Sequence, residues 1–453
     1  VAISGGISVP ENFVITGTSE ASGFAFPITN TSGTNSITGS ITLVGTGGVR
    51  FGASAGTLNV NGSIARNGTD VGSLLLAANA SSVVNVNAAI DLNGGALSII
   101  NPGTVVLAAQ STDIGNTTIF FGSPATNGPT LKLGVSDALP TNRSLTIGST
   151  GTSNGADRGT LDLAGFNQTV NALVGNVGTG ATPSAASTRR ITNSVAATTS
   201  MLTVGNGNAS GTFNGLIEDG AGKVALTKVG TGTLTLPTAS TYTGDTTVSG
   251  GTLSLSTASL AATSTVNLST GATMNLNFTG TNNITTLRIN GLAQAPGTWG
   301  SLTSSATNKT SLITGPGLLN ITAPQPAYDA WALASGLDNT PGRDATRYAD
   351  PDHDGVGNLV EYATKMNGNV SDTVPQSATK NGSVIDFIYT KNKSASDVTY
   401  TVEWSDTLGN DWSTSGVSAP TILNDNGVTQ VVKVGVPASG AMQRFVRLRV
   451  TMP

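Results

Sequence analysis

The sequence of 453 residues has no cysteine, few aromatic residues and little charge. Without cysteine there are no disulfides, no thiolate metal sites and no Cys–His nucleophile. Charged residues make up 10% of the chain, and a net charge of −4 leaves no basic stripe for nucleic acid. No apolar run approaches the roughly 20 residues that a membrane-spanning helix needs. We therefore expect no nucleic-acid partner and no transmembrane segment, and a start at Val1 without a signal peptide suggests a processed, exported chain.

A change in composition divides the chain. The whole chain has 58 glycines, and glycine, threonine, serine and asparagine dominate its first three-quarters. Short groups of valine, isoleucine and leucine recur in the same region. Beyond Pro324 and Pro326, residues 327–453 hold fourteen of the 25 acidic residues. Proline fixes its own φ and disfavours helix in the residue before it, so these two residues predict a hinge. The expected domains are a repetitive region at 1–323, a hinge with a helix and an acidic loop at 324–370, and a small β domain at 371–453.

One phrase recurs through the first region: a glycine turn followed by alternating apolar and small polar residues. It occurs at 56–60, 72–76, 95–99, 103–107, 159–163, 232–236 and 251–255. The alternation is typical of a half-buried strand, and consecutive phrases often lie 16 to 23 residues apart, about one coil of a β-solenoid. A string of β-sandwiches is the alternative, but it would need more core aromatics than the 5% present. The predicted fold class is mainly β: a β-solenoid (β-helix), then a short helical segment and a small β-sandwich.

Three segments of the first region resemble a known family. The stretch LTKVGTGTLTLPTASTYTGDTTVSGGTLSL (226–255) resembles the autotransporter-associated β-strand repeat, with its Gly-x-Gly-Thr-Leu strand, Tyr-Thr-Gly turn and closing Gly-Gly-Thr-Leu strand. Residues 30–64 resemble a divergent copy, and 291–322 are similar to the segment that often closes such regions. The resemblance implies a right-handed β-helix of the passenger type, in a bacterial protein that is secreted or displayed at the cell surface.

An acidic loop, DPDHDGVGNLVE, lies at 350–361 and fits the calcium pattern D-x-[DN]-x-[DN]-G-x5-E throughout. Calcium prefers several hard oxygens, and this spacing wraps the chain around one ion, with Gly355 permitting the sharp turn. Val356 would offer its carbonyl, Asn358 would act directly or through water, and Glu361 would bind through both oxygens. The predicted ligands are Asp350, Asp352, Asp354, Val356, Asn358 and Glu361. The alternative is a solvated acidic turn, and the number of matched positions favours calcium.

The surroundings of this loop depart from a complete EF-hand. Position eight, normally aliphatic, is Gly357, and no entering helix is predicted just before the loop. A helix is expected further back, at 327–335, and an exiting helix should follow the loop and end at 367–368. The segment therefore resembles the half-EF-hand, dockerin-like calcium loops of extracellular proteins. His353, the single histidine, should point outward, so a zinc or catalytic role is not expected.

Strand patterns at 383–392, 397–405, 427–436 and 444–451 predict a small β-sandwich at the C-terminal end. Trp404 and Trp412 could stack on carbohydrate, although packing is favoured in so small a domain. Arg444, Arg447 and Arg449 could pair with nearby acids or lie on a solvated strand face. The arrangement resembles a C-terminal module of secreted proteins from Verrucomicrobia-like bacteria.

Three functional hypotheses remain. Polysaccharide-degrading β-helix enzymes need clustered carboxylates, but Glu218 and Asp219 are the one adjacent pair in 1–323 and should face opposite ways, so no enzyme is expected. A surface adhesin that binds cell-surface or matrix glycans is plausible. The favoured hypothesis is an extracellular structural protein, a subunit of a surface fibre that self-assembles head to tail through open coil ends, with calcium fixing the hinge.

Overall fold

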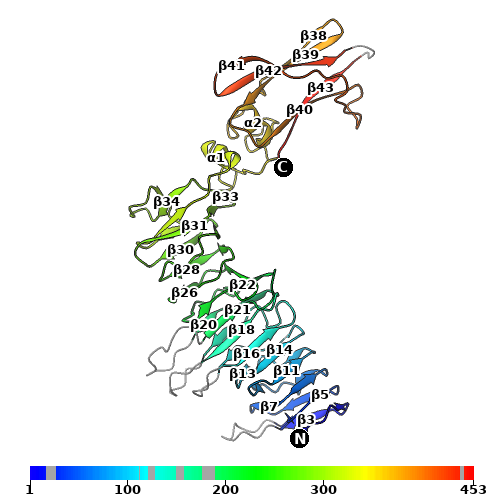
Figure 1. The fold of residues 1–453 in the computed structure, drawn as a ribbon, viewed down its shortest axis with the longest axis vertical. Coiled ribbons are helices and arrows are strands. Elements are labelled where there is room, and N and C mark those ends of the chain that lie inside the picture. The colour runs from blue at the N-terminus through cyan, green and yellow to red at the C-terminus, as the bar shows by residue number, and fades with distance from the viewer. Residues whose placement is uncertain (17–26, 112, 121–127, 149–157, 176–188, 439–442) are drawn as a thin grey trace. The chain divides into compact units, whose positions relative to one another are not determined.

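The computed structural model describes residues 1–16, 27–111, 113–120, 128–148, 158–175, 189–438 and 443–453. They form two compact units, one of Val1–Leu287 with Gly297–Thr322 and the other of Arg288–Pro296 with Ala323–Pro453. The first unit is a β-solenoid, and the second combines two short helices with antiparallel strands (Figure 1). The predicted mainly β fold class is confirmed. The acidic loop and the C-terminal strands share the second unit.

Three parallel sheets form the N-terminal part of the solenoid. Up to β14, hydrogen-bonded neighbours are three strands apart in the chain, so each coil contributes one strand to each sheet. The first sheet contains β1 (Ala2–Ile3), β4 (Thr29–Asn30), β7 (Val49–Ala53), β10 (Leu74–Ala78), β13 (Leu97–Ile100), β15 (Thr117–Ile119), β17 (Leu145–Ile147) and β20 (Leu173–Gly175). The second contains β2 (Ser8–Val9), β5 (Thr34–Ile37), β8 (Thr57–Val60), β11 (Val83–Val86), β14 (Thr104–Leu107), β16 (Thr130–Leu133), β18 (Gly159–Asp162), β21 (Arg189–Thr192) and β24 (Leu216–Ile217). The third contains β3 (Phe13–Thr16), β6 (Ile41–Val44), β9 (Ile64–Arg66) and β12 (Ile90–Asp91).

The C-terminal part of the solenoid continues the stacking with a second set of sheets. One is built from β19 (Gln168–Val170), β22 (Thr199–Val204), β25 (Lys223–Lys228), β27 (Thr246–Val248), β29 (Thr265–Leu268) and β32 (Thr286–Ile289). Another contains β23 (Gly211–Thr212), β26 (Thr233–Leu236), β28 (Gly251–Leu255), β30 (Ala272–Leu276) and β36 (Ile313–Thr314). A mixed sheet contains β31 (Thr281–Ile284), β37 (Leu318–Ile321), β34 (Gly297–Gly300) and β35 (Asn308–Lys309).

The register of the coils explains the recurring sequence phrase. Leu74 pairs with Val49 of the preceding coil and with Leu97 of the next, and all three side chains are buried. Period-two alternation points every second residue inward, and exact register stacks these residues into apolar columns. Each buried leucine or valine stabilises the stack by about 1.5–3 kcal/mol, so many short strands together supply a core without large aromatics.

The recurring glycines are required by the close approach of successive coils. A Cβ built on Gly62 would lie 1.9 Å from the carbonyl oxygen of Gly39, and one on Gly39 would lie 2.0 Å from that of Glu11. Both distances are far below any allowed contact, so the turns at these positions stack only if neither residue carries a side chain.

The second unit has a small aromatic core and two antiparallel sheets. Its helices are α1 (Ala327–Ala334) and α2 (Asn358–Thr364), and Leu292 of the short strand β33 (Leu292–Ala293) lies in the same core as both helices. One sheet has the order β38 (Gln376–Asn381), β39 (Val384–Asn392), β42 (Thr429–Pro437), β41 (Thr421–Asp425). The other pairs β40 (Thr399–Ser405) with β43 (Phe445–Thr451). Phe387 and Val434 of the first sheet share a core with Val402 of the second, as expected of two packed layers.

Arg444, just before β43, and Arg447 and Arg449 within it pair with acids, whereas the sequence pattern favoured a solvated strand face. Arg444 donates to Asp406 at 2.7 and 2.9 Å, and its guanidinium lies 3.7 Å from the centre of the Trp404 ring. Glu403 accepts from Arg447 and Arg449, and Arg447 also covers the ring of Trp412 at 3.8 Å. The two tryptophans are thus packed beneath guanidinium groups.

Candidate metal centre

The acidic loop is shaped by hydrogen bonds from its own backbone to its aspartates. Asp350 accepts the N–H of Asp354 at 3.2 Å and that of Gly355 at 2.9 Å, while Asp354 accepts the N–H of Val356 at 2.8 Å. Gly355 has φ +87°, the left-handed conformation that glycine adopts without strain. The glycine in the sequence pattern therefore stands where the loop turns most sharply.

The structure brings together the three aspartates predicted as ligands. One carboxylate oxygen from each of Asp350, Asp352 and Asp354 lies within 4.8 Å of those of the other two. Burial, together with the nearby negative charges, raises the pKa of Asp352 above its ordinary value, and its Oδ2 is buried without a hydrogen-bond partner among the described residues. The cluster is therefore a site of strong negative potential.

Glu361 lies in the first turn of α2, and its side chain is fully buried. Neither Oε1 nor Oε2 has a hydrogen-bond partner among the described residues. Burial, followed by the charges of Asp352 and Asp354, raises the pKa of Glu361 from its ordinary 4.5 to about 8. A buried carboxylate is usually satisfied by several donors, so this group stands out from the other acids of the chain.

The remaining predicted residues have different surroundings. Asn358 begins α2 and is fully buried, and its side-chain amide donates to the carbonyls of Asp344 at 2.8 Å and Thr346 at 2.9 Å. Val356 is half-buried within the loop. The side chain of His353 is exposed.

Asp372 is a fifth acid near the loop, and the sequence analysis did not identify it. Its backbone N–H donates to Oδ2 of Asp354 at 2.9 Å. Partial desolvation beside the loop and the charge of Asp354 raise the pKa of Asp372, although its side chain is largely exposed, and its charge contributes to the raised pKa of Glu361. The calcium pattern ends at Glu361, and Asp372 lies eleven positions further along the chain, so no spacing rule marked this residue.

Helix α2 is held firmly against the strands that follow it. Tyr362 is fully buried and donates to Asp397 at 2.6 Å, while Asn392 of β39 donates to the carbonyl of Tyr362 at 2.8 Å. Tyr400 of β40 donates to the carbonyl of Ala363 at 2.8 Å. The position of Glu361 is therefore fixed by the core of the second unit.

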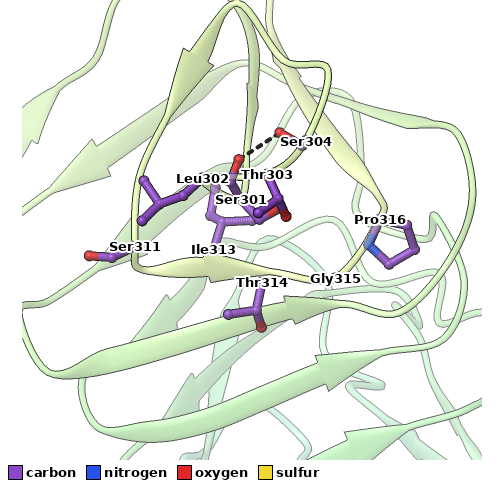
Figure 2. A pocket seen from close by; sticks show the side chains of 9 residues that line it. All are labelled: Ser301, Leu302, Thr303, Ser304, Ser311, Ile313, Thr314, Gly315 and Pro316. Carbon is purple, nitrogen blue, oxygen red and sulfur yellow. Dashed lines mark hydrogen bonds between the residues drawn. The ribbon is translucent and has the colours of Figure 1, made fainter.

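The solenoid has open depressions lined by small polar residues. One depression has a volume of about 600 Å³, and Figure 2 shows the side chains that line it. Within it, the hydroxyl of Ser304 donates to the carbonyl of Ser301 at 2.7 Å. Its lining is Ser301, Leu302, Thr303, Ser304, Ser311, Ile313, Thr314, Gly315 and Pro316. A second depression, of about 590 Å³, includes Ser210, Thr212, Asn214, Thr233 and Thr235. Neither lining carries a charged or aromatic side chain, and the polar side chains in them offer hydroxyl and amide groups beside the apolar Leu302, Ile313, Pro316 and Val174.

The adjacent acids of the solenoid are held by structural contacts. Glu218 pairs with Arg190 at 2.6 Å. Asp219 accepts from the backbone of Val224 and Thr243, and also from the hydroxyl of Thr243. Both carboxylates are therefore engaged in tying neighbouring segments together.

Comparison with known proteins finds one family in the solenoid. Residues 226–255 match the family described as passenger-associated-transport-repeat. The segment runs from within β25 to the end of β28, about one and a half coils, since Leu226 pairs with Thr246 of the next coil. Comparisons with curated proteins and with solved structures gave no significant match. The matched repeat and the solenoid around it fit a secreted or surface protein of the passenger type. No helix in the described part of the chain is long and apolar enough to cross a membrane.

Two of the buried polar side chains in the passenger-associated repeat explain part of its sequence pattern. Tyr242 is buried, and its hydroxyl lies 2.8 Å from that of Thr246. Lys228 is fully buried, and its ammonium donates to the carbonyls of Val229, Gly230 and Gly250. The lysine of the repeat is thus the hydrogen-bond donor for turns of two successive coils.

Proposed function

We propose that the chain is an extracellular structural protein of the passenger type, stabilised by one calcium ion bound in the loop at 350–361. The observation that carries the calcium site is the carboxylate of Glu361, which is buried with two oxygens unpartnered among the described residues and interacts electrostatically with the three loop aspartates. A buried charge without compensation is unfavourable by several kcal/mol, and like charges nearby add to this. A bound cation would remove both contributions.

The donor set favours calcium over other metals. The acids offer oxygen ligands only, the histidine of the loop is exposed, and the chain has no cysteine. Hard divalent cations prefer oxygen, and calcium accepts six to eight oxygen ligands in flexible geometry. Three aspartates, both oxygens of Glu361 and the carbonyl of Val356 would provide six.

The role proposed for calcium is structural. The loop, α2 and the C-terminal sheets belong to one compact unit, and α2 is fixed by hydrogen bonds to β39 and β40. We therefore assign the ion to stabilising that unit. A single loop on a helix held in this way is unlike a sensor, in which paired loops open a helix pair.

Isothermal titration of the chelator-treated chain with calcium tests the site. We expect one ion per chain with a Kd of about 10⁻⁴–10⁻³ M, the range of extracellular modules. Glu361→Gln should weaken binding strongly, while Asp245→Asn, a matched change on a solenoid acid, should not. Absence of binding in the unchanged chain, or equal binding by both variants, would overturn the calcium site.

For the solenoid we propose head-to-tail self-assembly. Within the described chain, β1, β2 and β3 are edge strands of their sheets, and Val1, Ile7 and Val14 on or next to them are exposed. Edge strands offer unpaired backbone groups, and a second copy could continue the stacking by adding a coil. Such a contact is heterologous and grows into a filament.

Negative-stain electron microscopy in calcium tests the assembly. Filaments formed by the unchanged chain and by Val71→Asp, an exposed valine away from the edge strands, but not by Val14→Asp, would support the proposal. Monodisperse rods in every sample would reject it.

The depressions lined by serine and threonine support a second candidate function, adhesion to surface or matrix glycans. Hydroxyl and amide groups can exchange hydrogen bonds with sugars, although the described linings offer no aromatic ring for stacking. We propose no catalytic role, since the adjacent acids Glu218 and Asp219 are both engaged in structural contacts. Binding of the monodisperse chain to a glycan array, lost on Thr314→Tyr, would favour the adhesin.

A further inference from the structure

The loop pattern assigns one place in the expected calcium coordination to Asn358, and the structure packs the side chain of this residue against the segment after α2. In the pattern, Asn358 would bind directly or through water. In the structure Nδ2 of Asn358 donates to the carbonyls of Asp344 and Thr346, and its buried Oδ1 has no hydrogen-bond partner among the described residues. A Cβ built on Gly368 would lie 2.8 Å from that Oδ1, so the amide is packed between the start of α2 and the segment after it. Asn358 therefore acts as a brace for the backbone.

Another acid reaches the same loop from outside the pattern. The backbone N–H of Asp372 donates to Oδ2 of Asp354, which places residue 372 directly beside a predicted ligand. Asp372 is exposed, so its side chain can turn toward an ion without first leaving a buried contact.

We propose that Asp372 supplies a further carboxylate to the calcium site, so that the ion ties the segment after α2 to the loop before it. The inference rests on the proposed calcium site. The loop itself provides six oxygens from Asp350, Asp352, Asp354, Val356 and Glu361, and calcium often takes seven in a pentagonal bipyramid. Asp372, directly or through a water molecule, completes this number in place of Asn358.

The consequence concerns the segment that leads into β38. Its ends are anchored, because Trp331 donates to the carbonyl of Met366 at 2.9 Å and Thr390 donates to that of Pro375 at 3.1 Å. Between these anchors, residues 369–374 are all described by the structure. Their one long-range hydrogen bond there is the bond from the backbone of Asp372 to Asp354. Calcium bound through Asp372 adds a second attachment at this point and restrains the path of the chain into the sheet.

Calcium titration of matched variants tests the role of Asp372. Asp372→Asn keeps the backbone N–H that bonds to Asp354, so the loop retains its connection. Asp386→Asn is the control, because it changes net charge equally but lies in β39, paired with Lys433 at 3.6 Å. We expect Asp372→Asn to raise the Kd about tenfold, the lower end of the effect of supporting metal contacts, and the control to bind like the unchanged chain. Equal affinities of the two variants would overturn the inference while leaving the calcium site intact, whereas an unchanged chain that binds no calcium would reject the site itself.

Hydrogen exchange of the full chain supplies an independent readout. Calcium should slow exchange of the amides at 369–374 in the unchanged chain and in Asp386→Asn, and this protection should be lost in Asp372→Asn at saturating calcium. Protection retained in Asp372→Asn would contradict the proposed tie.

Discussion

Lys228 in the solenoid and Glu361 in the C-terminal unit are both charged and fully buried, yet their surroundings are opposite. The ammonium of Lys228 donates to three carbonyls from two successive coils. The carboxylate of Glu361 has no hydrogen-bond partner among the described residues and lies near other negative charges. Burial lowers the pKa of Lys228 and raises that of Glu361, so in both cases the interior disfavours the charged form.

The two residues differ in whether the chain itself supplies the hydrogen-bond partners of the buried group. An ammonium has three protons, and the chain offers an acceptor for each, so Lys228 is satisfied internally. Arg66 repeats this arrangement in the N-terminal coils, where its guanidinium donates to the carbonyls of Gly45, Gly47 and Ser73. In the solenoid, backbone carbonyls thus accept hydrogen bonds from the buried cationic groups of Lys228 and Arg66. The C-terminal unit leaves the carboxyl group of Glu361 without such partners among its described residues, and in our proposal a bound cation compensates its charge.

Removing Lys228 should have the largest effect. Lys228→Ala leaves three carbonyls without their donor and opens a cavity between coils, and we expect a loss of about 3–5 kcal/mol in the free energy of unfolding. Lys223→Ala is the control, because Lys223 is an exposed residue of the same strand β25, and it should change stability by less than about 0.5 kcal/mol. Urea unfolding followed by circular dichroism measures both. Equal losses would show that Lys228 is not a buried hydrogen-bond donor.

Glu361→Gln should change stability in opposite directions with and without calcium. In chelator the folded chain must either bury the charge of Glu361 or take up a proton to neutralise it, and glutamine requires neither, so the second unit should become more stable. In calcium it removes a principal ligand; with about 2 mM calcium and a Kd of about 10⁻⁴ M, the stabilisation lost is about 1.8 kcal/mol. Thermal unfolding of the chain in both conditions measures the reversal. A variant that is less stable than the unchanged chain in chelator as well would contradict this description of Glu361.

The pH dependence in chelator is the control for that experiment. Because the pKa of Glu361 is raised in the folded state, the folded protein binds the proton more tightly than the unfolded chain. Its contribution to stability is complete below about pH 4.5 and is lost as the pH rises through about 8. The melting temperature of the second unit should therefore fall over this interval in chelator, and Glu361→Gln should flatten the dependence.

The sequence predicted those parts of the molecule in which local pattern and burial coincide. The phrases around Leu74 and Leu97 alternate because one face of each strand is buried, so the solenoid could be inferred before its register was known. Strands β38 and β41 were missed, since all of their residues are exposed and no apolar alternation marks them. The clustering of Asp350, Asp352 and Asp354 could be predicted from their alternate positions in the calcium pattern. The contact of Asp372 depends on how the chain returns after α2, which no short motif encodes.

Surface charges should have the smallest effect on the free energy of unfolding. An exposed ion pair of the solenoid tests this against the buried Lys228. Arg143 and Asp113 lie 3.9 Å apart, and each side chain is about half exposed. In water such a pair gains little attraction and loses side-chain entropy, so Arg143→Ala should change the free energy of unfolding by no more than about 0.5 kcal/mol. The small change should shrink further in about 1 M salt, where screening acts over about 3 Å. If Arg143→Ala lost as much unfolding free energy as Lys228→Ala, the stability of the solenoid would depend on exposed charges as much as on buried ones. The contrast between buried charges that have hydrogen-bond partners and exposed charges would then be wrong.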